Sequence, residues 1–280
     1  MTSLLVLLVL SAALLHAVWN TLVKMGGVPE FTIASFQLVG ALACLMLVPF
    51  VAPPARESWP MLFASVVIHN VYYLTMARAY RNGDLGQVYP LFRGLAPVLV
   101  AFGGFAFAGE WLSPVTLVGI CIVSAGIMSL ALHRGTGGQF QRTAVLWGLA
   151  TSLMIACYTV VDGIGVRAAG SRIGYILWLF IFEIVPIGTV LLLTQKRAFS
   201  TYLRTQWRSC LIGGLASSAA YGMVIFAMSL GAMAVVSSLR ETSVIFAALI
   251  ATFVLKEPFG YHRTVAAILV VSGVILMQLG

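Results

Sequence analysis

The chain has 280 residues, of which 61% are hydrophobic and 9% are charged, and its formal net charge is +8. Soluble domains are about 45–50% apolar and about 25% charged, so the composition excludes an ordinary water-soluble domain and indicates a protein embedded in lipid. A basic balance can indicate a nucleic-acid partner, but few polar faces remain to present it, and basic residues at the ends of membrane helices explain it better.

Ten segments are apolar over the roughly 20 residues that a membrane-spanning helix needs. In chain order they are residues 3–24, 31–52, 59–80, 87–108, 113–132, 144–167, 172–194, 208–230, 233–255 and 263–279. The longest polar connection, residues 195–208, is predicted to be a loop. Backbone groups in lipid must bond within their own segment, and no alternating barrel pattern is present. We therefore predict an all-α integral membrane protein with ten transmembrane helices.

The chain consists of two similar halves, joined by a glycine-rich polar segment at residues 133–142. Arg93 and Glu110 recur 147 positions later as Arg240 and Glu257. We therefore predict two five-helix repeats, residues 1–134 and 135–280. Because five is an odd number, the second repeat crosses the membrane in the opposite sense. Transporters built as inverted repeats bind substrate near the membrane midplane, where the repeats meet.

Lysine and arginine residues are distributed unevenly between the two faces of the membrane. Eleven follow odd-numbered segments and three follow even-numbered segments. Loops rich in these residues stay on the cytoplasmic side. The count therefore predicts a multi-pass protein of the plasma (inner) membrane with both termini outside.

Five ionisable residues lie inside the apolar segments: Arg93, Asp162, Glu183, Arg240 and Glu241. Such residues usually face a cavity or pair with one another, so an internal ion pair and a substrate site are both open interpretations. Arg240 and Glu241 are neighbours in the sequence, and adjacent residues on a helix do not face each other. We therefore predict that these two have separate partners, in the protein or on a ligand.

Polar side chains also occupy the first segment, where His16, Trp19 and Asn20 share one helical face at spacings of three and four. Two polar side chains in one apolar helix need a wet cavity or a hydrogen-bond partner, and a histidine can also carry protons. A single aromatic residue in a membrane helix more often packs or faces lipid. The aromatic residues that we nevertheless predict to line a cavity are Tyr73, Tyr158 and Trp178.

The sequence contains no motif for catalysis or for a bound group, such as HExxH or a Walker sequence. The four cysteines lie in or at the start of apolar runs and form no CxxC pair, so we predict packing residues, no metal and no cofactor. Gly163, Gly165 and Ala168 match a dinucleotide-binding fingerprint, but they end a spanning helix rather than follow a strand. We predict that these small residues serve close helix packing.

Several motifs together resemble the drug/metabolite transporter superfamily, EamA type. They are the His-Ala-Val-Trp-Asn run at residues 16–20, a proline-bearing fourth segment that closes on Gly109-Glu110, and a Lys256-Glu257 pair in the second half. Glycine-containing fifth segments follow in both halves. The resemblance implies alternating access around a central cavity without a bound cofactor. Members are mostly exporters of amino acids and other metabolites, including the YddG-type exporters of aromatic amino acids.

The chain departs from the family pattern in two respects. Small multidrug members use a glutamate in the first helix for proton coupling, and this chain has only His16 and Asn20 there. Family members commonly keep both termini in the cytoplasm, whereas the distribution of basic residues here predicts termini outside. The first departure argues against proton antiport by that route, and the second leaves the side of the termini open.

We predict a transporter that exports small zwitterionic metabolites, amino acids foremost and aromatic ones among them. An arginine would take the substrate carboxylate through paired N–H donors, and a carboxylate would take the ammonium. The predicted substrate-binding residues are His16, Trp19, Asn20, Tyr73, Arg93, Tyr158, Asp162, Trp178, Glu183, Arg240 and Glu241.

Two alternatives remain open at this point. A lipophilic-cation or drug exporter would need carboxylates and aromatic side chains but no essential arginine. A non-transporting membrane scaffold would gain nothing from charges deep in its helices. The expected partners are a small-molecule substrate and membrane lipid, with no nucleic acid. The sequence is compatible with a monomer and does not define the oligomeric state.

Overall fold

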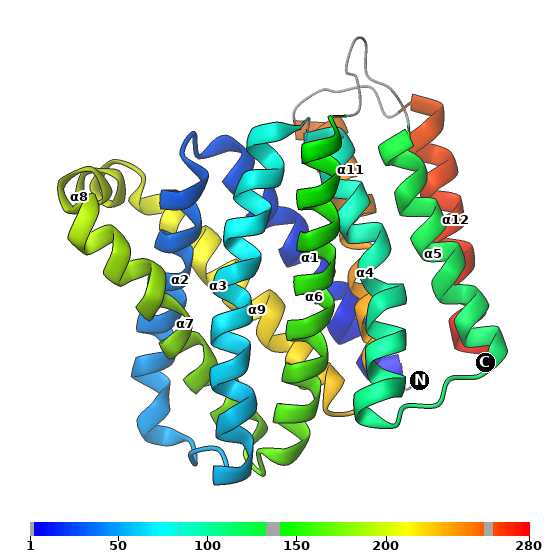
Figure 1. The fold of residues 1–280 in the computed structure, drawn as a ribbon, viewed down its shortest axis with the longest axis horizontal. Coiled ribbons are helices and arrows are strands. Elements are labelled where there is room, and N and C mark those ends of the chain that lie inside the picture. Colours follow the sequence, from blue (N-terminus) through cyan, green and yellow to red (C-terminus); the bar gives the residue numbers. More distant parts are fainter. Residues whose placement is uncertain (1–2, 84, 133–140, 255–259) are drawn as a thin grey trace.

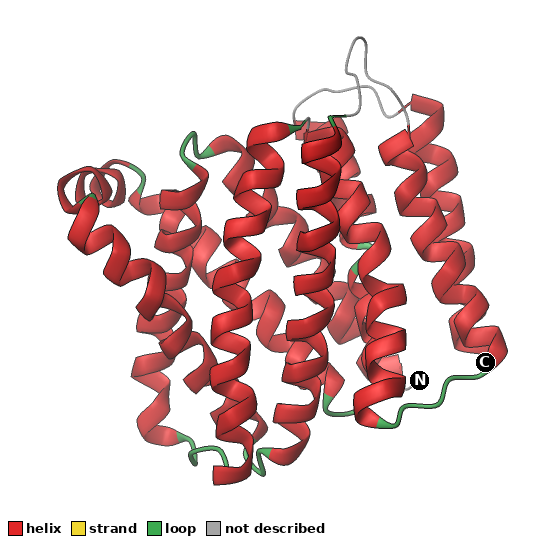
Figure 2. Cartoon of the chain, in the orientation of Figure 1, coloured by secondary structure: helices red, strands yellow, loops and turns green. Residues whose placement is uncertain are grey.

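A computed structural model describes residues 3–83, 85–132, 141–254 and 260–280, and every structural statement below concerns these residues. Within them, ten helical stretches are long and apolar enough to cross a membrane. The described residues contain helices and connecting loops and no strand (Figure 2). The predicted fold class, an all-α membrane protein of ten spans in two repeats, is confirmed.

The first half contributes five spans. They are α1 (Ser3–Met25), α2 (Pro29–Leu47), α3 (Trp59–Asn82), α4 (Leu85–Ala108) and α5 (Pro114–Leu132). Prolines stand in the first turn of α2 and α3 and at the start of α5. At these places the missing N–H removes no hydrogen bond and the fixed φ favours the helix.

The second half contributes the other five spans and one additional short helix. The elements are α6 (Arg142–Ala168), α7 (Arg172–Thr194), α8 (Lys196–Thr205), α9 (Trp207–Met228), α10 (Met233–Arg240), α11 (Ser243–Val254) and α12 (Gly260–Leu279). Ser171 caps α7, because its Oγ accepts a hydrogen bond of 3.1 Å from the N–H of Gly174.

The helices of the two halves pack in pairs that follow the repeat. Helix α3 packs on α6, and its counterpart α9 packs on α1. Helices α2 and α5 pack on their own counterparts, α7 and α12. Both ends of the chain lie at the same end of the bundle (Figure 1). The predicted boundary between residues 134 and 135 lies outside the described residues.

The prediction of a polar loop over residues 195–208 was wrong, because α8 occupies most of it. Phe199 is buried against Phe31 and Leu191, and the Tyr202 hydroxyl lies 2.7 Å from Thr32 Oγ1. Phe199, Tyr202 and Leu203 recur at helical spacing, which was the available signal for an amphipathic helix. Figure 1 shows α8 nearly end-on at the edge of the bundle, crossing the direction of the spans.

The ninth span, predicted as one helix over residues 233–255, is interrupted between α10 and α11. Hydrogen bonds to the third residue back tighten the turn, from Thr242 N–H to Leu239 O and from Val244 N–H to Glu241 O. Such bonds mark a stretch of 3₁₀-like winding inside a helix. The interruption changes the rotational register of the side chains on either side of it.

Two further predictions concern small residues. Gly163 packs against Met233 and Gly165 against Tyr175, so closely that a Cβ at either position would collide, which confirms the prediction of helix packing. Cys44 and Cys210 are buried, as expected for packing residues, whereas Cys121 is exposed on the outer face. No group of three or more potential metal ligands occurs among the described residues.

Candidate functional site

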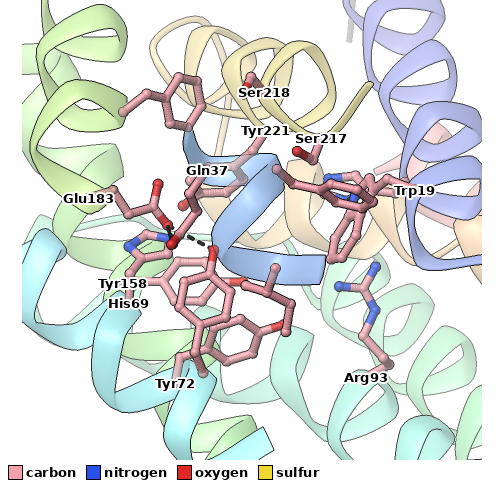
Figure 3. A pocket seen from close by; sticks show the side chains of 15 residues that line it. Trp19, Gln37, His69, Tyr72, Arg93, Tyr158, Glu183, Ser217, Ser218 and Tyr221 are labelled. Atoms are coloured by element: carbon pink, nitrogen blue, oxygen red, sulfur yellow. Dashed lines mark hydrogen bonds between the residues drawn. The ribbon is translucent and has the colours of Figure 1, made fainter. Parts of the chain in front are cut away.

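A cavity of about 70 Å³ lies in the middle of the bundle, between helices of both halves (Figure 3). A water molecule needs about 10–15 Å³ of such volume, so the cavity has room for roughly five waters. Polar side chains surrounded by aromatic rings form its wall. The lining residues are His16, Trp19, Ile33, Phe36, Gln37, His69, Tyr72, Tyr73, Arg93, Tyr158, Phe180, Glu183, Ser217, Ser218 and Tyr221.

A carboxylate stands on one side of the cavity. Glu183, from the middle of α7, is 5% exposed. Its Oε1 accepts hydrogen bonds from the Tyr73 hydroxyl at 2.8 Å and from Gln37 Nε2 at 3.2 Å. Within the described chain no donor reaches Oε2, so this oxygen can accept from a ligand. The Gln37 Oε1 atom is also buried, and no described residue forms a hydrogen bond with it.

An arginine stands on the opposite side, as Figure 3 shows for Arg93 and Glu183. Arg93, from α4, donates from Nη2 to Ser243 Oγ at 2.9 Å. Its Nε lies 2.8 Å from Glu241 Oε2. That N–H does not point at the oxygen closely enough to form a hydrogen bond, so the contact is ionic. Among the residues that the structure describes, Arg93 is the one arginine that lines the cavity.

Arg240 and Glu241 lie behind the cavity wall and are fully buried. Contrary to our prediction, the two neighbours contact each other, because Arg240 Nε and Nη2 lie 3.3 and 3.2 Å from Glu241 Oε1. The prediction assumed an unbroken helix, and the tightened turn between α10 and α11 removes that assumption. Glu241 therefore forms ion pairs with two arginines, with Arg240 through Oε1 and with Arg93 through Oε2.

The charges of this cluster do not balance. Two guanidinium groups share one carboxylate, and Arg240 Nη1 is buried without a hydrogen-bond partner within the described residues. Buried charge that is not fully compensated is costly, so the cluster attracts a further negative group. Only Arg93 of the three borders the cavity, and the favourable position for that group is beside it.

Aromatic rings form the wall around Glu183. The rings of His69 and Tyr158 stack with centroids 4.1 Å apart, and Tyr158 meets Tyr72 and Tyr221 edge to face at 5.5 Å each. The negative faces of such rings attract cations as well as apolar groups. The site therefore combines an acidic aromatic side with a basic side.

Asp162 supports this wall from behind and does not line the cavity. It is fully buried in α6. The Tyr221 hydroxyl donates to its Oδ2 at 2.6 Å and the Tyr175 hydroxyl to its Oδ1 at 3.0 Å. The carboxylate thereby fixes the ring of Tyr221, which does border the cavity.

The first helix contributes an unsatisfied donor. Trp19 Nε1 donates to His16 Nδ1 at 2.9 Å. An indole nitrogen can only donate, so Nδ1 must accept and the neutral imidazole carries its hydrogen on Nε2. That Nε2 is buried without a partner among the described residues, although His16 lines the cavity. Asn20 instead donates to the backbone oxygen of His16 at 2.6 Å.

The structure thus brings six of the eleven predicted residues to one cavity: His16, Trp19, Tyr73, Arg93, Tyr158 and Glu183. None of the other five predicted residues lines the cavity; they are Asn20, Asp162, Trp178, Arg240 and Glu241. The ring of Trp178 packs on those of Trp59 and Phe182, each at a centroid distance of 5.6 Å. Whether the six bind substrate stays a prediction.

Sequence reasoning missed part of the lining. Gln37 and the pair Ser217-Ser218 are polar residues inside apolar spans, which was the available signal for them. His69 and Tyr221 stand out in the same way as polar or aromatic residues within helices.

A further ion pair lies at the end of the bundle where both termini lie. Glu110, just after α4, accepts hydrogen bonds from the Met233 N–H at 3.1 and 3.0 Å, and its Oε1 lies 2.5 Å from Arg167 Nη2. Arg167, at the end of α6, also donates to the backbone oxygens of Met228 and Gly231. Glu110 therefore ties α4 and α6 to the start of α10. Its predicted counterpart, Glu257, lies outside the described residues.

Comparisons with known proteins agree with this architecture. The family model described as the EamA-like transporter family matches residues 3–132 and 142–279. A solved structure described only as "Crystal structure of protein" superposes with a TM-score of 0.81 at 19% sequence identity, covering 100% of this chain and 98% of that chain. At that identity the likeness concerns the fold alone. The comparison with curated proteins gave no match.

Proposed function

The chain belongs to the EamA-like transporter family of the drug/metabolite transporter superfamily, and on that premise we propose that it exports small zwitterionic metabolites, amino acids foremost. Transport proceeds by alternating access through the central cavity, without a bound cofactor. The observation that carries the proposal is the position of Arg93 and Glu183 on opposite sides of one cavity.

The two charged sides complement the two ends of an amino acid. A carboxylate beside Arg93 accepts charge-assisted hydrogen bonds from the guanidinium and supplies the negative charge that the arginine pair lacks. An ammonium beside Glu183 donates to Oε2 and faces the aromatic wall. His16 Nε2–H and Gln37 Oε1 are a further buried donor and acceptor for the same ligand.

The volume of the cavity agrees with a transport cycle that has more than one conformation. Room for roughly five waters is too little for most amino acids, so binding requires movement of the wall. Pro90 and Pro97 inside α4 and Pro186 inside α7 each remove a helical hydrogen bond. These two helices carry Arg93 and Glu183, so movement at the prolines would displace both charged groups.

A lipophilic-cation exporter is the second candidate, because the aromatic wall around Glu183 would also hold a cation without a carboxylate. Such a substrate carries no negative group that Arg93 could bind. A membrane scaffold without transport activity leaves the buried charges and the cavity unexplained.

Counterflow of labelled amino acids in proteoliposomes tests the proposal, with Glu183→Gln as the first variant. We expect exchange to fall at least about tenfold, because a hydrogen bond to a charged group contributes about 1.5–3 kcal/mol. Glu57→Gln is the matched control, since Glu57 is an exposed carboxylate just before α3 that does not line the cavity, and it should leave exchange unchanged. Absence of amino-acid exchange by the unmodified protein under any gradient would refute the proposal.

A further inference from the structure

A second, larger cavity adjoins the central one. It measures about 370 Å³ and lies between α2, α3 and α7. Tyr73 and Ile33 line both cavities, so these two side chains form the partition between them. We call this second cavity the lateral chamber.

The lateral chamber differs from the central cavity in chemistry. Six of its eleven lining residues are apolar: Ile33 of α2, Leu74 and Ala77 of α3, and Pro186, Ile187 and Val190 of α7. Leu74 and Val190 are more than half exposed, so the chamber opens on the outer surface of the bundle, where lipid surrounds a membrane protein.

Charged residues of the lateral chamber are concentrated at one end. Glu30 at the start of α2 forms an ion pair with Arg81 at the end of α3. Arg78, one turn before Arg81, also lines the chamber. The charged end therefore coincides with the ends of the helices, and the apolar part lies deeper, toward Tyr73.

Glu183, to which the proposed function assigns the substrate ammonium, also holds the partition in place. The Tyr73 hydroxyl donates to Glu183 Oε1 at 2.8 Å, and Asn70, another chamber residue, donates to the backbone oxygen of Glu183 at 3.4 Å. In the proposed function the substrate ammonium donates to Glu183 Oε2, the oxygen next to the one that accepts from the Tyr73 hydroxyl. The polar end of a substrate would thus bind directly at the partition, with the lateral chamber on the other side of Tyr73.

The volumes of the two cavities indicate which part of a substrate each one can hold. The central cavity holds a few waters, which corresponds to the compact ammonium and carboxylate of an amino acid, while the lateral chamber has several times that space and an apolar lining. Burial of apolar surface contributes about 25 cal/mol per Å², so an apolar side chain gains most in the chamber.

We propose that the lateral chamber is a binding site for the side chain of the substrate, and that the substrates are zwitterions with a bulky aliphatic or aromatic group. This inference rests on the proposed function, because it assigns the zwitterionic end to Arg93 and Glu183. Small amino acids such as glycine would use the central cavity alone and make no use of the chamber.

Filling the chamber tests the inference. Ala77→Trp places an indole inside the lining, one helical turn from Tyr73. Val67→Trp is the matched control, because Val67 lies on the same helix, is 62% exposed and borders neither cavity. We expect Ala77→Trp to reduce counterflow of leucine and phenylalanine at least about tenfold, as for a loss of about 1.4 kcal/mol. Glycine and alanine exchange should stay within about twofold of the unmodified protein, and the control should change neither class.

A second pair of variants covers the case in which Ala77→Trp fails to fold. Val190→Trp fills the chamber from α7, with Leu193→Trp as its exposed control on the same helix. If the filled variants exchange bulky amino acids as well as the controls do, the chamber holds only bilayer lipid and the inference is wrong, while the proposed function stands. An equal loss for small and bulky substrates also contradicts it. If the unmodified protein exchanges no amino acid, both proposals fail.

Discussion

Amino-acid counterflow should fall at least about a hundredfold when Arg93 is replaced by alanine, because two charge-assisted hydrogen bonds of about 1.5–3 kcal/mol each are lost. Arg93→Lys should not restore it fully, since an ammonium cannot reproduce the planar pair of donors. Glu241 keeps Arg240 as its partner in the variant, so the buried cluster becomes neutral and the fold is retained. The defect is therefore expected in transport rather than in stability.

The Arg93 variant also separates the two candidate substrates. Exchange of a lipophilic cation should survive Arg93→Ala, since a cation gains nothing from a guanidinium. Arg56→Ala, at an exposed arginine in the connection before α3, is the control and should leave both activities intact. Undiminished amino-acid exchange by a correctly folded Arg93→Ala protein would show that the carboxylate is bound elsewhere.

Replacing Glu241 by glutamine should destabilise the protein by about 3–5 kcal/mol, the usual cost of breaking a buried ion pair by removing one partner. The variant leaves two buried guanidinium groups, Arg93 and Arg240, without their shared carboxylate. Thermal or denaturant unfolding in detergent measures the change. Glu57→Gln, at an exposed carboxylate, should stay within about 0.5 kcal/mol of the unmodified protein.

A double variant tests the cause of that loss. Combining Glu241→Gln with Arg240→Met removes one of the two uncompensated charges, and apolar replacement of a buried ion pair is often close to neutral. The double variant should therefore be more stable than Glu241→Gln alone, a non-additivity expected of residues in one network. A Glu241→Gln protein that unfolds like the unmodified one would mean that the carboxylate does not hold the two arginines.

The spans were predictable because length and hydropathy are enough to identify a helix in lipid. The repeat was predictable from matches such as Arg93 with Arg240. The interruption at Glu241-Thr242 was not, because no proline or glycine marks it and the polar run there is equally compatible with an unbroken helix that faces a cavity. Helix α8 carried a signal in Phe199, Tyr202 and Leu203, but its many polar residues favoured a loop.

The candidate site was only partly predictable, because a polar residue in a span shows that a partner is needed and not which one. Tyr158 and Asp162 lie one turn apart on α6, yet Tyr158 borders the cavity and Asp162 is held by tyrosines of α7 and α9. Likewise Trp19 and Asn20 both bond within α1, to the ring and to the backbone of His16, yet only Trp19 lines the cavity. These differences depend on the rotation of neighbouring helices, which one sequence does not contain.

The charged pair in the ninth span also affects how the protein is made. On insertion scales an arginine at the centre of a spanning helix costs about 2.5–3.5 kcal/mol. Insertion of residues 233–254 into the membrane by the translocon is therefore unfavourable when no other helix offers a partner. Arg93, which forms an ion pair with Glu241, lies in α4 and is synthesised long before. We infer that the first half acts as a template for the late segment during biogenesis. Glycosylation mapping of residues 233–254, with and without the first half ahead of them, would show insertion only in the longer chain.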